Sequence, residues 1–183
     1  FIMVNVAPVL ETERLKLIPL NSAMHLSENY VSWMNDTEVI KYLESGGNYT
    51  LELLKEFLSK VDSNPILFWA IHIKETNKHI GNIKIDPINS KHLFGEYGIM
   101  MGDKNEWGKG YAKEASLAVI EYCFSPKINL RKLNLGVYKK NTNAVLLYQK
   151  IGFEIDGCFK KHVVTNGGFD DILRMAIFNP NQS

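Results

Sequence analysis

The sequence predicts a single α/β domain, with one mixed β-sheet and helices packed on it. Two observations lead to this fold class. The 183 residues, 45% of them hydrophobic, suit one domain with one core. Strand and helix patterns also fail to alternate regularly along the chain, which excludes a doubly wound parallel sheet.

The first third of the chain is mainly helical after one strand. Leucines alternate with charged residues in TERLKLIPL, as in a strand with one buried face, and Pro19 is expected to end it. Capping residues and apolar spacing then predict helices. The expected elements are a strand over 12–19, a helix from 21 or 22 through 33, a short helix from 36 or 37, and, after the break at 45–48, a helix over 50–61.

The rest of the chain is richer in strands. ILFWAIHI is almost continuously apolar, as expected of a strand covered on both faces. Asn166-Gly167-Gly168 is a strong hairpin signal. The expected elements are strands over 66–73, 80–85 and 94–101, a helix of about four turns ended by Pro126, a strand over 132–138, a helix over 141–150 ended by Gly152, and strands over 153–164 and 169–178.

Composition excludes several functional classes. The formal net charge is +1, so no excess of positive charge indicates nucleic-acid binding. The five histidines lack metal-ligand spacing, and no metal is expected. No apolar run is long enough to cross a bilayer, and the first ten residues do not resemble a signal peptide. Cys123 and Cys158 indicate reduced thiols in a cytoplasmic protein, while Phe1-Ile2 before Met3 leave the native start open.

NEWGKGYAKEA, residues 105–115, places two glycines one residue apart before a helical pattern. Amides at such a helix start can hold an anion, and Lys104, Lys109 and Lys113 add charge that Glu106 opposes. A Rossmann fingerprint fails because Lys113 stands where a third glycine is needed, and a Walker loop fails because Gly110 follows Gly-Lys. A plain connection to a helix and a cradle for the pyrophosphate of coenzyme A both remain.

A second pattern lies in the segment from Asn141 to Phe153. Three- and four-residue steps place Asn141, Ala144 and Tyr148 on one helical face. Taken alone, the segment also fits an amphipathic helix with a half-buried tyrosine and a glycine cap.

Together these motifs resemble the GNAT N-acetyltransferase superfamily. WGKGYAKEA and N-x-x-A-x-x-L-Y-x-K-x-G-F occur in the order and spacing of that family, and EYGIMM and TERLKLIPL resemble its RimJ/RimL-like branch. The resemblance extends from about Glu11 to Phe178 and departs at Asn105, where the family usually has Gln or Arg. It implies one domain over residues 1–183, with a mixed, mostly antiparallel sheet flanked by helices and a V-shaped coenzyme cleft.

The resemblance implies transfer of an acetyl group from acetyl-CoA to an amine by direct attack in a ternary complex. The pyrophosphate would bind the loop amides, and the pantetheine arm would pair with the strand ending at Met101. The implied coenzyme-binding residues are Ile99, Met100, Met101, Asn105, Trp107, Gly108, Lys109, Gly110, Tyr111, Ala112, Asn141 and Ala144.

Acetyl transfer to an alkylamine requires removal of a proton. With a pKa of about 10.4, such an amine costs about 4 to 5 kcal/mol to deprotonate at pH 7. Glu96 is the candidate base, directly or through water, and the alternative is a structural carboxylate paired with a cation. The resemblance makes Tyr148 the candidate acid for the leaving thiolate, with backbone N–H groups near Gly98 and Ile99 stabilising the oxyanion.

The acceptor is expected to bind the variable segments, where Trp33, Glu44, Tyr49 and His162 are candidate contacts. The acceptor would be a small-molecule amine or a protein N-terminus, and a homodimer is compatible with the family. Two other functions remain open. One is a GNAT-shaped module that binds acyl-CoA as a sensor without turnover, and the other is an interaction domain that binds no coenzyme.

Overall fold

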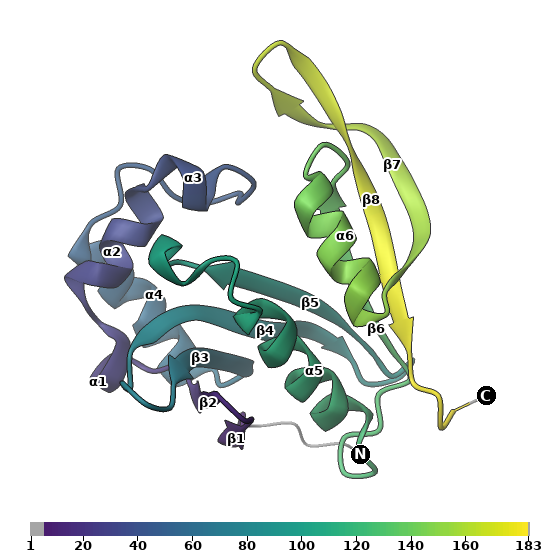
Figure 1. The fold of residues 1–183 in the computed structure, drawn as a ribbon, viewed down its shortest axis with the longest axis horizontal. Helices are drawn as coiled ribbons and strands as arrows, with labels where there is room; N and C mark the ends of the chain where they lie inside the picture. The colour runs from purple at the N-terminus through teal and green to yellow at the C-terminus, as the bar shows by residue number, and fades with distance from the viewer. Residues whose placement is uncertain (1–5, 183) are drawn as a thin grey trace. The chain divides into compact units, whose positions relative to one another are not determined.

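A computed structural model describes residues 6–182 and shows the mixed α/β architecture predicted from the sequence (Figure 1). Its elements are β1 (Leu10–Glu11), β2 (Leu15–Pro19), α1 (Ser22–His25), α2 (Glu28–Asn35), α3 (Thr37–Ile40), α4 (Leu51–Ser63), β3 (Leu67–Ile73), β4 (His79–Asn89), β5 (Phe94–Met101), the 3₁₀ helix η1 (Lys104–Glu106), α5 (Tyr111–Phe124), β6 (Lys132–Tyr138), α6 (Thr142–Ile151), β7 (Glu154–Thr165) and β8 (Gly168–Phe178).

Within residues 6–182 the strands form one eight-stranded sheet in the order β1-β2-β3-β4-β5-β6-β8-β7. The β5–β6 register is parallel and joins Phe94–Glu96 to Lys132–Asn134. The registers of β1–β2, β2–β3, β3–β4, β6–β8 and β7–β8 are antiparallel. The sheet is therefore mixed and mostly antiparallel, as predicted.

One predicted helix is two helices in the structure. We expected a single helix from Asn21 or Ser22 through Trp33, but α1 ends at His25 and α2 begins at Glu28. Asn21 caps α1 by accepting a bond from the Met24 amide, and Ser27 caps α2 by accepting one from Tyr30. The prediction was wrong at this point because a serine inside an apolar pattern can begin a helix as well as continue one.

The chain divides into two compact units, each described by itself below. The first unit comprises the described residues up to Asp86 together with Gly98–Val119, and the second comprises Pro87–Tyr97 and the described residues from Ile120 onward. None of the helices in residues 6–182 has the length and apolar character needed to span a membrane.

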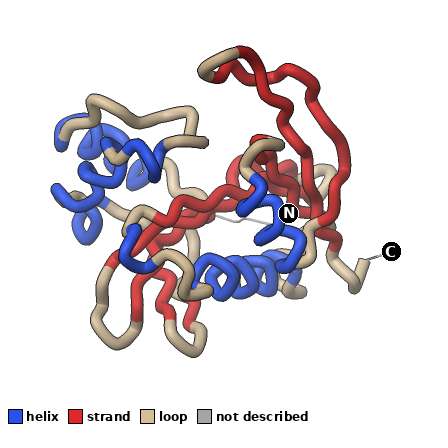
Figure 2. Tube along the Cα trace, turned by 45° about the horizontal axis from the view of Figure 1, so that its top comes forward, coloured by secondary structure: helices blue, strands red, loops and turns tan. Residues whose placement is uncertain are grey.

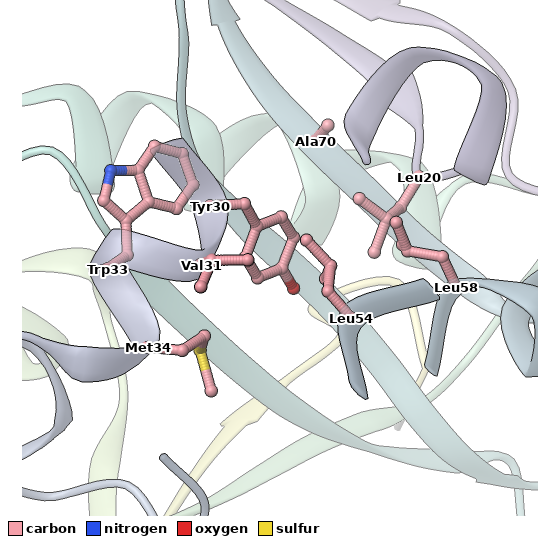
Figure 3. Close-up of a cluster of buried hydrophobic side chains, with 8 residues drawn as sticks. All are labelled: Leu20, Tyr30, Val31, Trp33, Met34, Leu54, Leu58 and Ala70. Carbon is pink, nitrogen blue, oxygen red and sulfur yellow. The ribbon is translucent and has the colours of Figure 1, made fainter. Parts of the chain in front are cut away.

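The core of the first unit includes fully buried side chains of β2, β3 and α5, such as Leu17, Trp69 and Val119. Figure 2 shows the helices and strands along the chain. β3 is buried almost throughout, as its continuous apolar run predicts. A cluster of buried side chains fills the space between α2, α4 and β3, with the Tyr30 ring at its centre (Figure 3). Its members are Leu20, Tyr30, Val31, Trp33, Met34, Leu54, Leu58 and Ala70.

The second unit is built on the long ribbon of β7 and β8, with α6 lying along it (Figure 1). Buried Leu133, Leu135 and Val137 alternate along β6, and Met175 of β8 is fully buried. Buried Asn179 follows β8 and donates to the Leu130 carbonyl at 2.8 Å. These contacts fix the positions of β6 and β8 in the second unit, which also carries the candidate residues Glu96, Asn141, Ala144 and Tyr148.

Candidate functional site

The loop between η1 and α5, residues 107–110, has a backbone that requires its two glycines. Gly108 has φ of 76° and Gly110 has φ of 83°, a region that costs other residues about 1–2 kcal/mol. A Cβ placed on Gly108 would meet nothing within 4 Å. The glycines are therefore set by backbone conformation rather than by a neighbouring protein segment, and the space beside Gly108 is open.

The start of α5 adds hydrogen-bond donors to this loop. The Gly110 carbonyl accepts the first helical bond, from the Glu114 amide at 3.1 Å. Helix geometry then leaves the amides of Tyr111 and the next two residues without an intrahelical acceptor. Their dipoles favour an anion at this end of the helix. The loop therefore has the donor chemistry that a phosphate group needs.

The loop is also attached to the end of β5. The Trp107 indole N–H donates to the Met101 carbonyl at 2.9 Å, and about 41% of the Trp107 side chain surface is exposed. Ile99, Met100 and Met101, the predicted pantetheine strand, are all half-buried. In the first unit, the structure thus joins the predicted strand and the predicted loop through one side chain.

Two of the three lysines expected to supply charge, Lys104 and Lys109, are paired with carboxylates. Lys109 Nζ lies 2.9 Å from Glu106, and Lys104 Nζ lies 2.7 Å from Asp36. Lys78 also contacts Glu106, at 3.2 Å. The bonds from Lys109 and Lys78 hold the pKa of Glu106 below its usual value, so this carboxylate stays ionised beside the loop.

Arg14 contacts the same loop, and the sequence analysis did not single it out. Its Nη1 donates to the Lys109 carbonyl at 2.9 Å, its Nε donates to Glu114 at 2.8 Å, and its guanidinium lies 4.4 Å from the centre of the Tyr111 ring. Thr12 donates to the other Glu114 oxygen at 2.6 Å. We call Thr12, Arg14 and Glu114 the Arg14 clamp.

In the second unit, Tyr148 lies on α6 among aromatic rings. Its ring centre is 5.8 Å from that of Tyr97 on β5 and 6.0 Å from that of Phe153. Burial raises the pKa of the Tyr148 phenol to about 12 because the phenolate would lose solvation. At neutral pH this side chain is therefore a neutral phenol with a proton to donate.

Asn141 forms the N-cap of α6, as its position in the sequence predicts. Its Oδ1 accepts a bond from the Ala144 amide at 3.4 Å, and Gly152 ends the helix with φ of 122°. The cap uses the carbonyl oxygen of the side chain, which leaves its NH₂ group as the donor that a ligand could use.

Glu96 on β5 forms a bidentate ion pair with Arg174 on β8. The two nitrogen-to-oxygen distances are 2.7 and 2.8 Å, and both side chains are partly exposed. A Cβ on Gly136 of β6 would lie 2.9 Å from Arg174 Nη1, so the guanidinium reaches Glu96 across the bare backbone of β6. A glycine inside a strand often marks such a close approach.

Glu96 and Tyr148 lie on opposite faces of β5. Neighbouring residues in a strand point to opposite faces, and Tyr97 is the residue that contacts Tyr148. The two candidate catalytic side chains therefore do not form one hydrogen-bonded pair. If both act in the reaction, each acts on a different proton.

The four candidate acceptor contacts have very different environments. Trp33 is only 4% exposed, and its indole packs so closely on Gly102 that a Cβ there would overlap it. Tyr49 is half-buried and its backbone is held by Asn35 through bonds of 2.7 and 2.9 Å. Glu44 and His162 are exposed. Trp33 is therefore a core residue of the first unit and offers little surface to an acceptor.

Comparisons with known proteins agree with this architecture. The Acetyltransferase (GNAT) domain family matches residues 14–154. An uncharacterized N-acetyltransferase, p20, of Bacillus licheniformis is 25% identical over 175 residues, which cover 92% of this chain and 94% of that protein. Spermidine N(1)-acetyltransferase of Escherichia coli K12 is 34% identical over 98 residues, 54% of this chain and 52% of that protein.

Among solved structures, the spermidine N-acetyltransferase of Vibrio cholerae, crystallised with CoA and spermine, superposes with a TM-score of 0.81. It is 25% identical, and the match covers 92% of this chain and 97% of that one.

Proposed function

Because the chain belongs to the Acetyltransferase (GNAT) domain family and is an N-acetyltransferase, we propose that it uses acetyl-CoA to acetylate a primary amine. The amine belongs to a small molecule or to a protein N-terminus, and the branch is the RimJ/RimL-like one. The observation that carries this proposal is the loop at Gly108 and Gly110, because both glycines have positive φ angles and the space beside Gly108 is open, as a phosphate group needs.

The residues of the first unit fit an anionic coenzyme. The amides from Trp107 to Ala112 would hold the diphosphate, and the half-buried end of β5 would offer its backbone to the pantetheine amides. Lys109 would remain paired with Glu106 and would contribute little net charge. Binding would therefore depend mainly on backbone donors, which explains why Asn105 can replace the usual Gln or Arg.

The second unit supplies the groups that move protons. Glu96 would accept the amine proton after one of its two bonds to Arg174 opens. Tyr148 would donate its proton, or a hydrogen bond, to the departing thiolate, and its raised pKa keeps that proton in place.

Similar proteins and exposed polar groups point to a class of acceptor. The matched spermidine acetyltransferases suggest polyamines as one class of amine to test. Exposed Glu44 and half-buried Tyr49 in the first unit would contact a cationic acceptor, because a carboxylate and an aromatic ring both attract an ammonium group.

An acceptor screen tests the proposal. The purified protein is mixed with acetyl-CoA and a panel of polyamines, amino sugars, amino acid amides and N-terminal peptides, and the release of free CoA thiol is measured. We expect turnover with at least one class of amine. Acetyl-CoA binding without turnover on any amine would instead favour an acyl-CoA sensor, and the absence of binding would favour an interaction domain.

A further inference from the structure

Arg14 is fixed on three sides at the edge of the glycine loop. Glu114 holds Nε, the Lys109 carbonyl holds Nη1, and the guanidinium lies over the ring of Tyr111. The remaining nitrogen, Nη2, lies 3.4 Å from the point where a Cβ of Gly110 would be. The guanidinium is therefore placed against the second of the two glycines.

Both carboxylate oxygens of Glu114 accept hydrogen bonds in this arrangement. One of its oxygens accepts from Thr12 Oγ1 at 2.6 Å and from the Arg14 amide at 3.0 Å, and the other accepts from Arg14 Nε. Burial raises the pKa of Glu114, but the bonds from Thr12 and Arg14 outweigh it, so the net pKa is lowered. The carboxylate is thus ionised and anchors Arg14.

Arg14 keeps donors to spare. A guanidinium carries five N–H groups, and the hydrogen bonds recorded within residues 6–182 use two of them. Its side chain is 42% exposed, so solvent or a ligand can reach it. Lys104 and Lys109, in contrast, have their ammonium groups on carboxylates. Arg14 therefore fits a phosphate better than either lysine does.

We propose that Arg14 is a coenzyme-binding residue of this enzyme, which holds the Gly108–Gly110 loop through the Lys109 carbonyl and binds the diphosphate of CoA through its Nη2 side. The inference rests on the proposed function, because it assumes that this loop receives CoA. Glu114 and Thr12 act as positioning residues, since Glu114 bonds Arg14 and Thr12 bonds Glu114. A planar guanidinium suits two phosphate oxygens at once.

Calorimetric titration with CoA tests this role in the wild type and in Arg14→Gln. The matched control is Arg131→Gln, which also loses one positive charge and one bond from an arginine to a backbone carbonyl, that of His92 at 2.7 Å. We expect Arg14→Gln to weaken CoA binding about tenfold or more and Arg131→Gln to leave it within about twofold. Equal affinity of Arg14→Gln and wild type would overturn the inference.

Salt dependence separates a direct charge contact from mere support of the loop. If Arg14 faces the diphosphate, CoA affinity falls less steeply with NaCl in Arg14→Gln than in the wild type, because one screened contact is missing. If Arg14→Gln binds CoA more weakly but with the same dependence on NaCl as the wild type, Arg14 only supports the loop and does not contact the diphosphate. Glu114→Gln should weaken binding less than Arg14→Gln and keep the wild-type slope.

The type of phosphate is tested with 3′-dephospho-CoA, which keeps the diphosphate. If Arg14→Gln loses the same affinity for CoA and for dephospho-CoA, the diphosphate assignment is supported. If Arg14→Gln binds dephospho-CoA as tightly as the wild type does, the assignment is contradicted. Wild-type binding of CoA is the control for the proposed function itself. If the wild type binds no CoA, the proposed function fails, whereas failure only in the Arg14 comparison leaves that function intact.

Discussion

In the part of the chain that the structure describes, each unit contains an arginine–glutamate pair, and the two pairs differ in how many residues bond the glutamate. Glu114 in the first unit accepts three hydrogen bonds from two residues. Among residues 6–182, the hydrogen bonds to the Glu96 carboxylate in the second unit come from Arg174, through two parallel bonds. A carboxylate with several independent anchors stays in place, whereas one with a single partner is released by one side-chain movement.

This difference suggests that the first pair serves binding and the second serves chemistry. Glu114 supports a loop whose shape must persist for a diphosphate to be held. Glu96 must exchange a partner to accept a proton, which a single bidentate contact permits. Substitutions in the first region should therefore change coenzyme affinity, and substitutions in the second should change turnover.

The largest effect is expected from Gly110→Asp in the first region. The residue has φ of 83°, so any side chain adds strain, and a carboxylate there would repel the diphosphate and attract Arg14. We expect CoA affinity to fall by at least about a hundredfold, measured by calorimetry. Gly167→Asp, with φ of 98° in the β7–β8 turn, is the control for strain alone. Intact affinity in Gly110→Asp would remove the coenzyme from this loop.

Glu96→Gln tests the second region with nearly the same shape. The amide cannot take the amine proton, so we expect the kcat to fall by about a hundredfold while CoA affinity stays within about twofold. Glu114→Gln provides the contrast, because it should lower CoA affinity instead. A normal kcat in Glu96→Gln would leave Glu96 with a structural role only.

Tyr148→Phe should have a smaller effect on turnover than Glu96→Gln. The phenol contributes one proton or hydrogen bond to the leaving thiolate, so we expect the kcat to fall by about tenfold with little change in CoA affinity. With a pKa of about 12, Tyr148 stays protonated up to about pH 11. Steady-state kinetics from pH 7 to 10 should therefore show no decline that is caused by its ionisation, and unchanged turnover in the variant would exclude the role.

The smallest effect concerns three histidines in the core of the first unit. His25 Nδ1 lies 3.1 Å from the Asn21 amide nitrogen, and His25 Nε2 lies 3.0 Å from His72 Nε2. His79 stacks on His72 with ring centres 5.2 Å apart. Burial, followed by the neighbouring histidines, lowers the pKa of His25 to about 4, and burial also lowers that of His79 to about 4.

The sign of the pH effect follows from these lowered values. Between about pH 6.5 and pH 4 the unfolded chain binds more protons than the folded chain, so stability is lost as the pH falls through this range. We expect a loss of about 1 kcal/mol for each of His25 and His79 between pH 7.5 and pH 6, seen as a lower Tm. His25→Gln should flatten this dependence, and His162→Gln, at an exposed site, should not.

Most of the fold was predictable because local signals determine it. The hairpin at Asn166–Gly168, the Asn141 cap and the strand over 94–101 all stand where the sequence places them. The two loop glycines do as well, since a positive φ is a local property of the backbone. The break between α1 and α2 was missed because Ser27 can act as a cap or as a helical residue, and packing decides between them.

The ion pairs could not be predicted in the same way. Arg14 and Glu114 are 100 residues apart, and Glu96 and Arg174 are 78 apart. Charged residues on exposed strand and helix faces have many alternative partners, and no periodicity distinguishes the one that is used. One signal was present: Gly136 interrupts an otherwise regular strand, and in the structure it leaves room for Arg174.

A crystal structure of the protein with CoA tests the central claim most directly, namely that the backbone donors of the glycine loop hold the coenzyme. We expect diphosphate oxygens within about 3 Å of the amides between Gly108 and Ala112, with Arg14 Nη2 facing the same group. A coenzyme bound elsewhere, with these amides facing only solvent, would contradict it.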